Sequence, residues 1–531
     1  MPAAMKTPGV YIVEKSAFPS SVVEVATAIP AFIGYTESAD NSGKSLLNKP
    51  WRITSMAEYH VYFGFGPNPK FTIDKIESED PVELAANASF LQTYEADGAE
   101  HTDGYALNRL GKSAGGNYHL YYSMLLFFQN GGGPCYIVSI GNYSDEVEAD
   151  RLTGGIGQLV KEQEPTMVVM PDAVLLDQET CIAVQQSALQ HCGEKMKNRV
   201  TILDVWEGYK GRKDPDGDCI DNFRNALGIN FLDFGIAYYP WINTTIVQDN
   251  DLSYANIANP EALQGILRTE LEIPEEAPDE SDVAAVQRVE TVNNLTAWAD
   301  GSPGETLDEK NANATLQNKS LLAMSPLFNT ILGEAKNQLN LLPPSAAMAG
   351  VYTMVDNDRG VWKAPANVSL SSVVSPAVEI DSEEQEDLNV TTQGKSINAI
   401  RSFIGEGVLV WGGRTLDGNS LDWRYVQVRR TMIMLEESIR MAAKAYVFEN
   451  NEANTWVTIK SMVNNFLTGI WKRGGLAGSS PGDAFAVFVG LGETMTPEDI
   501  LEGIMRVTVL VALIRPAEFI EITFQQQMQQ S

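Results

Sequence analysis

The two ends of the chain each carry a short apolar run that predicts a β-strand. Residues 7–14 read TPGVYIVE, a Pro-Gly turn signal followed by β-branched and aromatic residues, and residues 518–525 lead into an alternation of apolar and polar positions. A strand at a chain end exposes unpaired backbone groups on both edges, and natural proteins usually cover such edges. We therefore expect both strands to have partners. The strand residues concerned are Val10, Tyr11, Ile12, Val13, Phe519, Ile520, Glu521, Ile522 and Phe524.

The region from Cys135 to Ile242 alternates short apolar runs with stretches that suit helices. The runs are PCYIVSIG, TMVVMPDA, RVTILDVW and FGIAYYPWI. Strands of this kind, separated by helices, are typical of a parallel or mixed sheet that is covered on both faces. The pattern predicts an α/β domain over residues 131–250.

The last third of the chain predicts two amphipathic helices, a strand and a short capped helix. The first helical stripe runs from Met432 to Tyr446 and the second from Trp456 to Ile470, both at spacings of three and four. DAFAVFVG then reads as a strand. Thr496, followed by Pro and two acidic residues, has the features of a helix N-cap.

Two polar regions separate these patterns. Residues 38–118 are rich in Gly, Asn, Asp and Ser, and we interpret residues 29–130 as a loop-rich segment. Residues 270–290 carry eight carboxylates against the single Arg288, so residues 251–340 are expected to form an acidic surface insertion. A solvated outer face explains these acids better than a cation site does.

Composition narrows the classes of partner. The 531 residues suffice for two to four domains, and 69 acidic against 38 basic residues give a net charge of −31, which argues against nucleic acid as a partner. Four cysteines without a CxxC pair indicate neither a disulfide framework nor a zinc site, as expected in a reducing cytoplasm. The longest apolar run, residues 507–514, is too short to span a bilayer, and no signal peptide or membrane insertion is expected.

Matches to catalytic and binding motifs fail on their own requirements. GSSPG at residues 478–482 fits a nucleophile elbow, but all four histidines precede Ser480, whereas that motif needs a later histidine. Three GKS tripeptides lack the earlier glycine of a P-loop. DPDGDCIDNFRN has Cys219 where a calcium loop needs glycine, so we interpret it as an exposed turn before a helix.

Two acidic residues lie at the ends of apolar runs, where α/β sheets often bind ligands. No Gly-rich turn follows Asp172 or Asp204, so we expect each to cap the turn or helix that follows it. We also expect His191 and Cys192 to be structural. The sequence therefore predicts no catalytic residue, cofactor or metal site, and no enzymatic activity.

Three stretches together resemble the sheath proteins of contractile phage tails and related contractile injection systems. They are TPGVYIVE with AIPAFIG, LPPSAAMAGVYTMVDNDRGVWKAPANVSL, and the run from INAIRSFIGEGVLVWGGRTLD through WRYVQVRRTMIMLEESI to RPAEFIEITF. The resemblance covers about the first 35 and the last 190 residues. Residues 135–242 are similar only in general pattern, and residues 250–335 match nothing in the family.

The resemblance implies a fold, an assembly and a set of partners. It implies an inner α+β domain built from both ends of the chain with strand-exchange arms, and an outer α/β domain that carries the acidic insertion. It further implies a homo-oligomeric, sixfold helical stack of rings around an inner tube protein, with baseplate and terminal cap proteins. Such a particle is assembled in the bacterial cytoplasm as a phage tail or a tail-like injection particle. The expected segments are 1–28 (arm), 29–130 (loop-rich), 131–250 (α/β), 251–340 (insertion), 341–515 (inner domain) and 516–531 (C-terminal arm).

Strand addition between copies would satisfy the terminal strands. β-augmentation supplies backbone partners, and because the contacts are head-to-tail they propagate into a helix instead of closing a dimer. The sequence therefore predicts that each copy is completed by its neighbours.

Charge suggests where an inner tube would be bound. Residues 421–475 contain eight basic and five acidic residues, a reversal of the overall sign. The candidate contacts are Lys472, Arg473, Arg429 and Arg430, with Glu498, Asp499 and Glu502 of the short helix as the competing group; internal ion pairs are an equal alternative. Two other functions stay open: a passive self-assembling layer or filament, and a cytoplasmic α/β enzyme.

Overall fold

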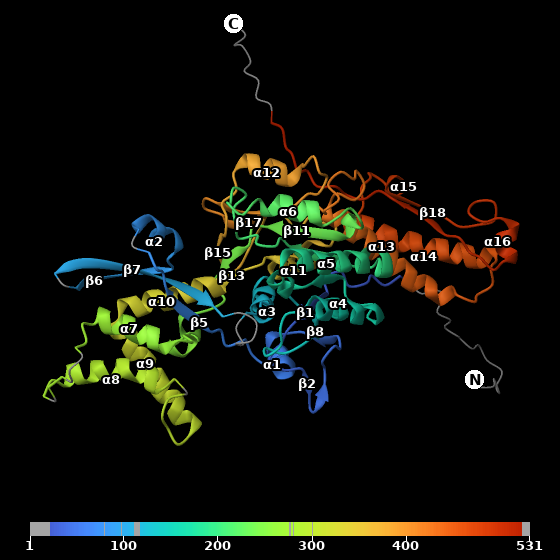
Figure 1. The fold of residues 1–531 in the computed structure, drawn as a ribbon. Helices are drawn as coiled ribbons and strands as arrows, with labels where there is room; N and C mark the ends of the chain where they lie inside the picture. Colours follow the sequence, from blue (N-terminus) through green and yellow to red (C-terminus); the bar gives the residue numbers. More distant parts are fainter. Residues whose placement is uncertain are drawn as a thin grey trace, which may run out of the picture. The chain divides into compact units, whose positions relative to one another are not determined.

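The computed structural model describes residues 22–522 except 79, 97, 111–116, 275–277, 280 and 300. Internal contacts divide the chain into two compact units (Figure 1). The larger unit is Ala28–Arg429, and the smaller unit combines Met1–Thr27 with Arg430–Ser531. Helix α13, Val426–Ala443, begins in the larger unit and continues into the smaller one.

A nine-stranded mixed sheet forms the centre of the larger unit. Its order is β14-β17-β16-β11-β10-β9-β1-β8-β4, in which six neighbouring strands from β16 to β8 are parallel and the strands at both edges are antiparallel. The predicted α/β sheet is thus confirmed as four of its central strands, β8 to β11. The strands are β1 Pro30–Gly34, β4 Trp51–Ile53, β8 Cys135–Ser139, β9 Met167–Val169, β10 Val200–Asp204, β11 Gly235–Tyr239, β14 Val368–Ser369, β16 Asn398–Phe403 and β17 Gly407–Trp411.

Helices cover both faces of this sheet. Every residue of β1, β8, β10 and β11 is buried, which explains why these strands read as continuous apolar runs. Helix α4 packs beside α5 and α3 beside α11, and both pairs contact the central strands. The helices are α1 Met56–Phe63, α3 Leu120–Gln129, α4 Ala149–Gln158, α5 Gln178–Gln190, α6 Cys219–Ala226, α11 Ser345–Arg359 and α12 Ser382–Asn389.

A second sheet with its own helices in the larger unit joins two segments that the sequence analysis kept apart. The three-stranded sheet β5-β7-β6 comes from the expected loop-rich segment, and helices from the expected acidic insertion pack on it (Figure 1). The interpretation of residues 71–109 as loops is wrong. The many polar residues of these strands hid the alternation of apolar and polar positions that indicates a strand. The elements are β5 Phe71–Lys75, α2 Pro81–Asn87, β6 Phe90–Ala96, β7 Ala99–Arg109, α7 Pro260–Glu270, α8 Val283–Ala297, α9 Leu307–Met324 and α10 Pro326–Asn340.

Two small sheets complete the larger unit. A three-stranded sheet has the order β13-β12-β15, and β2 pairs with β3 in a short hairpin. These strands are β2 Asp40–Asn41, β3 Lys44–Ser45, β12 Ile242–Thr244, β13 Leu341–Leu342 and β15 Val373–Pro376. The expected boundary at residue 341 is not where the contacts divide the chain, because residues 341–429 supply α11, α12, β14, β16 and β17 to the larger unit.

The smaller unit contains the elements that the last third of the sequence predicted. Both amphipathic helices, the DAFAVFVG strand and the Thr496 N-cap are confirmed, and Thr496 and Asp499 form a reciprocal capping box. The β-branched run after α16 forms a further strand, β19. The bounds are α14 Ala453–Lys472, α15 Pro481–Ala484, β18 Phe485–Phe488, α16 Pro497–Leu501 and β19 Thr508–Val511.

Candidate assembly site

The smaller unit presents a two-stranded antiparallel sheet of β18 and β19. Its register pairs Phe485 with Val511 and Phe488 with Thr508. Helix α14 packs against β18, and Val487 is buried. Two strands alone are marginally stable in water, so support from α14 is needed to hold them.

Both outer edges of this sheet are without a further strand among residues 22–522. The Ala512 amide donates to the Ala484 carbonyl at 2.8 Å, on the side of β19 that faces β18. Because backbone groups alternate along a strand, those of Val509 and Val511 face the other edge. Leu510 is 57 % exposed. An extended segment could therefore add to β19 through main-chain hydrogen bonds.

The structure assigns no strand to the described residues of the C-terminal arm. Residues 514–522 carry no assigned strand, and the side chains of Phe519, Ile520 and Ile522 are 75 %, 78 % and 69 % exposed. Glu521 is exposed as well. Phe524 and the N-terminal arm residues Val10, Tyr11, Ile12 and Val13 lie outside the described residues.

Arg429 and Arg430 are buried, which differs from the expectation that they face a tube. The Arg429 guanidinium lies 4.2 Å from the Trp423 ring centroid and 4.8 Å from that of Phe234, and 3.5 Å from the Asp233 carboxylate. Arg430 donates to the carbonyl of Thr27 at 3.0 Å. The excess of basic residues in this part of the sequence did not indicate that Arg429 and Arg430 have their partners within the folded chain.

The other basic candidates lie at the end of α14. Lys472 is exposed. Arg473 forms an ion pair with Glu24, and its side chain stays half-exposed. The internal ion pair that the sequence left open as an alternative is thus present for Arg473.

The acidic candidates lie near the other end of α14. The Asn451 side chain, just before α14, donates to the Ile504 carbonyl, just after α16, at 3.0 Å. Asp499 accepts from Arg506 at 3.0 Å, and this bond holds the pKa of Asp499 below its ordinary value; Glu498 and Glu502 are exposed. At 1.5 Å per residue, α14 separates Lys472 from this group by roughly 28 Å.

The carboxylates at the strand ends of the larger unit act as caps. Asp172 accepts from the amides of Tyr35, His119 and Leu120 at 3.0, 2.6 and 3.1 Å. Asp204 accepts from the amide and hydroxyl of Ser345 at 2.9 and 2.5 Å, at the start of α11. Burial raises the pKa of Asp172 to about 6 and that of Asp204 to about 7, against the opposing effect of these hydrogen bonds. The structural role is as expected, but the expected partner is wrong: Asp172 binds the start of α3 and Asp204 the start of α11, each distant in sequence, and the following helices α5 and α6 are capped by Asp177 and Asp218.

The remaining motifs also have structural roles. Ser480 of GSSPG caps α15 with Asp483, and Asp218 of DPDGDCIDNFRN caps α6. All four cysteines are buried and free. Across the part of the chain that the structure describes, no three His, Cys, Asp or Glu side chains cluster as a metal site, and no helix is long and apolar enough to cross a membrane.

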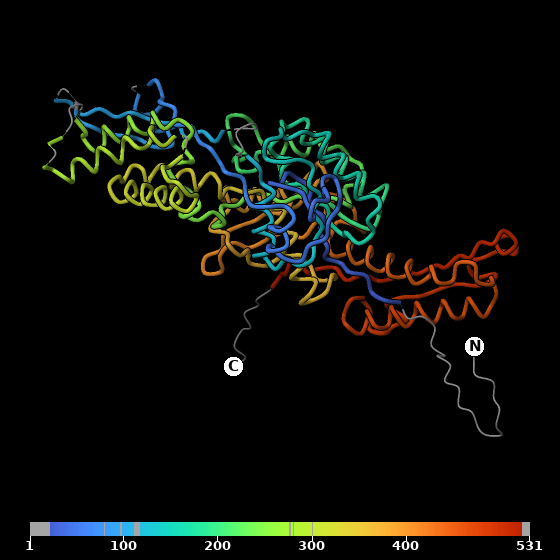
Figure 2. Tube along the Cα trace, turned by 90° about the horizontal axis from the view of Figure 1, so that it is seen from below, coloured from blue at the N-terminus to red at the C-terminus, as the bar shows by residue number. Residues whose placement is uncertain are grey.

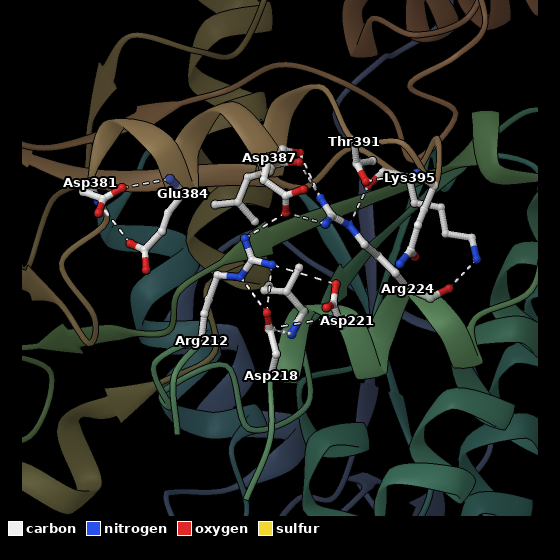
Figure 3. A network of polar contacts seen from close by, with 12 residues as sticks. Arg212, Asp218, Asp221, Arg224, Asp381, Glu384, Asp387, Thr391 and Lys395 are labelled. Carbon is white, nitrogen blue, oxygen red and sulfur yellow. Dashed lines mark hydrogen bonds and ion pairs between the residues drawn. The ribbon is translucent and has the colours of Figure 1, made fainter. Parts of the chain in front are cut away.

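A partly buried polar cluster in the larger unit, around the buried Arg224, was not predicted by the sequence analysis (Figure 3). Arg224 donates to the Asp387 carboxylate at 2.7 Å and to the Lys395 carbonyl at 3.1 Å, and Arg212 donates to the same carboxylate at 2.8 Å. Burial alone would raise the pKa of Asp387, but the two arginines outweigh it and hold this pKa below the ordinary value. The partners are more than 160 positions apart, so no local pattern could have paired them.

Comparison with known proteins connects the smaller unit to one family. Residues 419–527 match the family described as phage tail sheath C-terminal domain. A tail sheath protein of Vibrio phage KVP40 is 26 % identical over 210 residues, which is 38 % of this chain and 30 % of that protein. The match thus spans less than a third of that relative's length.

Solved structures extend the similarity of fold to nearly the whole chain. The sheath of an extracellular contractile injection system, the PVC sheath complex in contracted state, is 25 % identical with a TM-score of 0.54, and 98 % of each chain is covered. The anti-feeding prophage helical sheath in contracted state is 24 % identical with a TM-score of 0.56, covering 98 % of this chain and 100 % of that one. On these matches, the C-terminal part of the chain is similar to the phage tail sheath C-terminal domain, and nearly the whole chain is similar in fold to contractile sheath proteins.

Proposed function

We propose that this protein is the structural subunit of a contractile sheath. Copies polymerise as stacked six-subunit rings around an inner tube, and the sheath shortens to drive the tube through a target envelope. The observation that carries this proposal is the β18–β19 sheet, both of whose edges lack a further strand among residues 22–522, and which lies inside the stretch that matches the sheath C-terminal domain. The matched sheaths in contracted state support the motile part of it.

The open sheet gives the terminal arms a docking place. One arm from each of two neighbouring copies would add a strand to each edge and convert a two-stranded sheet into a four-stranded one. Each added strand of about five residues forms about four backbone hydrogen bonds, worth roughly 1 kcal/mol each. Exposed Phe519, Ile520 and Ile522 would add apolar burial. One link is modest, but every copy takes part in several.

Contraction requires that these links survive while subunit bodies rearrange. The larger unit has its own buried sheet and its own layers of helices, so it can move as a rigid body. Hinges of a few residues beside the arms, around residues 14–21 and 515–516, would absorb the rotation. The energy of contraction would come from the difference between two packings of the same body.

The tube, baseplate and terminal cap are the remaining proposed partners. Lys472 at one end of α14 and Glu498 with Glu502 at the other are exposed charges that could bind a complementary tube reversibly. We no longer propose Arg429 and Arg430 as tube contacts, because their side chains are buried.

Negative-stain microscopy of the purified protein tests the proposal. We expect striated tubes in two classes, long with a narrow bore and short with a wide one. Tubes or layers of one fixed geometry would favour the passive filament or layer, and a small monodisperse oligomer would contradict sheath assembly altogether.

A further inference from the structure

A short segment at the start of the described chain is tied to the helices of the smaller unit. The amide of Val25 donates to the hydroxyl of Ser438 on α13 at 3.1 Å, and Ser438 is fully buried. Glu24 forms an ion pair with Arg473, directly after α14. Figure 2 shows this blue segment running between the orange traces of α13 and α14. The segment therefore contacts both helices.

A third contact holds the end of the same segment. Arg430, near the start of α13, donates to the carbonyl of Thr27 at 3.0 Å. The three contacts are made by residues 24, 25 and 27. Their partners are the side chains of Arg473, Ser438 and Arg430, which lie on α13 or directly after α14. An extended segment has no internal hydrogen bonds, so such contacts with neighbouring elements are what fix its path.

We propose that Glu24–Arg473 and Val25–Ser438 form an anchor that fixes the point at which the N-terminal arm leaves its subunit. Arg473 is then an arm-positioning residue and not a tube contact. The inference rests on the proposed sheath function, because it concerns how far the exchanged arm reaches. The anchor itself, however, is a property of the single chain and can be measured without assembly.

The position of the anchor decides the reach of the arm. From Glu24 back to Val13 there are eleven residues, which span at most roughly 40 Å when extended. If the anchor opened, the next fixed contact along the chain would be Thr27, whose carbonyl accepts from Arg430 at 3.0 Å. Three more residues would add roughly 10 Å of reach. A longer tether lowers the effective concentration of the arm at its docking edge and weakens the choice among neighbours.

Charge reversal tests the ion pair, because reversal creates repulsion where simple truncation of a half-exposed pair changes little. Glu24→Arg and Arg473→Glu are each made in the full-length chain, together with the double exchange. The matched control is the Lys460–Glu493 pair, which lies at 3.4 Å in the same unit but does not touch residues 22–27. Lys460→Glu, Glu493→Lys and their combination complete the set.

Hydrogen exchange of the unassembled chain gives the first readout. We expect either single reversal at residue 24 or 473 to speed exchange at the Val25 amide about fivefold, and Ser438→Ala to do the same, because each frees one contact of that amide's segment. The double exchange should restore wild-type exchange, and the Lys460–Glu493 set should leave it unchanged. Unchanged exchange at Val25 in both single reversals would overturn the anchor.

Assembly gives the second readout. We expect the two single reversals to reduce the yield of sheaths about tenfold or to give irregular tubes, and the double exchange to restore regular ones. If exchange at Val25 responds as expected but sheath yield and regularity do not change, the anchor does not position the arm and the inference is refuted. Failure of the wild-type chain to form sheaths would instead refute the proposed function, since the exchange results do not depend on it.

Discussion

The two units of the chain differ in how far their sheets are buried. In the larger unit, the central strands β1, β8, β10 and β11 are buried throughout, and the carboxylates of Asp204 and Asp387 have hydrogen-bond donors. In the smaller unit, a two-stranded sheet keeps both edges unoccupied within the described residues, and Phe448 is fully exposed at the turn between α13 and α14. The larger unit has a buried central sheet, whereas the smaller unit has a two-stranded sheet that the proposed arms of other chains would extend.

Removing the N-terminal arm should have the largest effect on this contrast. We expect deletion of residues 1–14 to leave a folded monomer that forms no sheaths, because one strand per copy is lost while the described contacts of residues 22–27 stay. Circular dichroism and negative-stain microscopy measure the two outcomes. Deletion of residues 2–6, ahead of the strand, is the matched control. Normal sheaths from the shorter chain would show that the arm is dispensable.

Blocking the open edge of β19 should have the second-largest effect on sheath assembly. Val509→Pro removes a backbone donor that faces away from β18, where proline is tolerated because no strand of residues 22–522 pairs with that edge. We expect sheath formation to fall by more than tenfold with a small loss of thermal stability. Val509→Ala changes the side chain and keeps the donor, so it should assemble normally. If both variants assemble alike, strands do not add to this edge.

Disrupting the partly buried polar cluster around Arg224 should destabilise the larger unit alone. Arg224→Ala leaves Asp387 with one arginine partner and leaves a buried carbonyl without its donor. We expect a loss of about 3–5 kcal/mol in the free energy of unfolding. Arg212→Ala, at the more exposed side of the same carboxylate, should cost about 1 kcal/mol. Denaturant titration measures the free energy of unfolding of both variants. Equal losses would contradict the expectation that the more deeply buried arginine contributes more to stability.

The buried carboxylates predict a dependence of stability on pH. The folded pKa of Asp204 is raised to about 7 and that of Asp172 to about 6, so the folded chain binds more protons than the unfolded one above about pH 4. The free energy of unfolding should therefore fall as pH rises from about 4 to about 7. Asp204→Asn should remove the part of this slope between pH 6 and 7 in thermal melts. Asp177→Asn, at an exposed helix cap, should leave it unchanged.

Reversal of an exposed charge should have the smallest effect. Lys472→Glu is expected to weaken co-assembly with the inner tube severalfold without changing the melting temperature, since the side chain is exposed. Lys444→Glu changes the charge of the chain equally and serves as the control. Sedimentation with purified tube protein measures the difference, and equal binding by both variants would remove Lys472 from the contact.

The sequence predicted the smaller unit better than the larger one. The stripes of α13 and α14 and the Thr496 cap are local patterns that the structure confirms. The sheet β5-β7-β6 was missed because its buried positions are few and its other positions polar. The burial of Arg429 was missed because its partners include Phe234, almost two hundred positions away.

The sequence by itself determined the periodic elements and the helix caps of the smaller unit, because each depends on residues within a few positions of one another. Only the tertiary structure decided three features. They are the strand order of the central sheet, the packing of the acidic segment's helices on the sheet of the loop-rich segment, and the burial of Arg429 and Arg430. These features depend on contacts between residues far apart in sequence, whose formation is governed by packing and burial and leaves no local pattern.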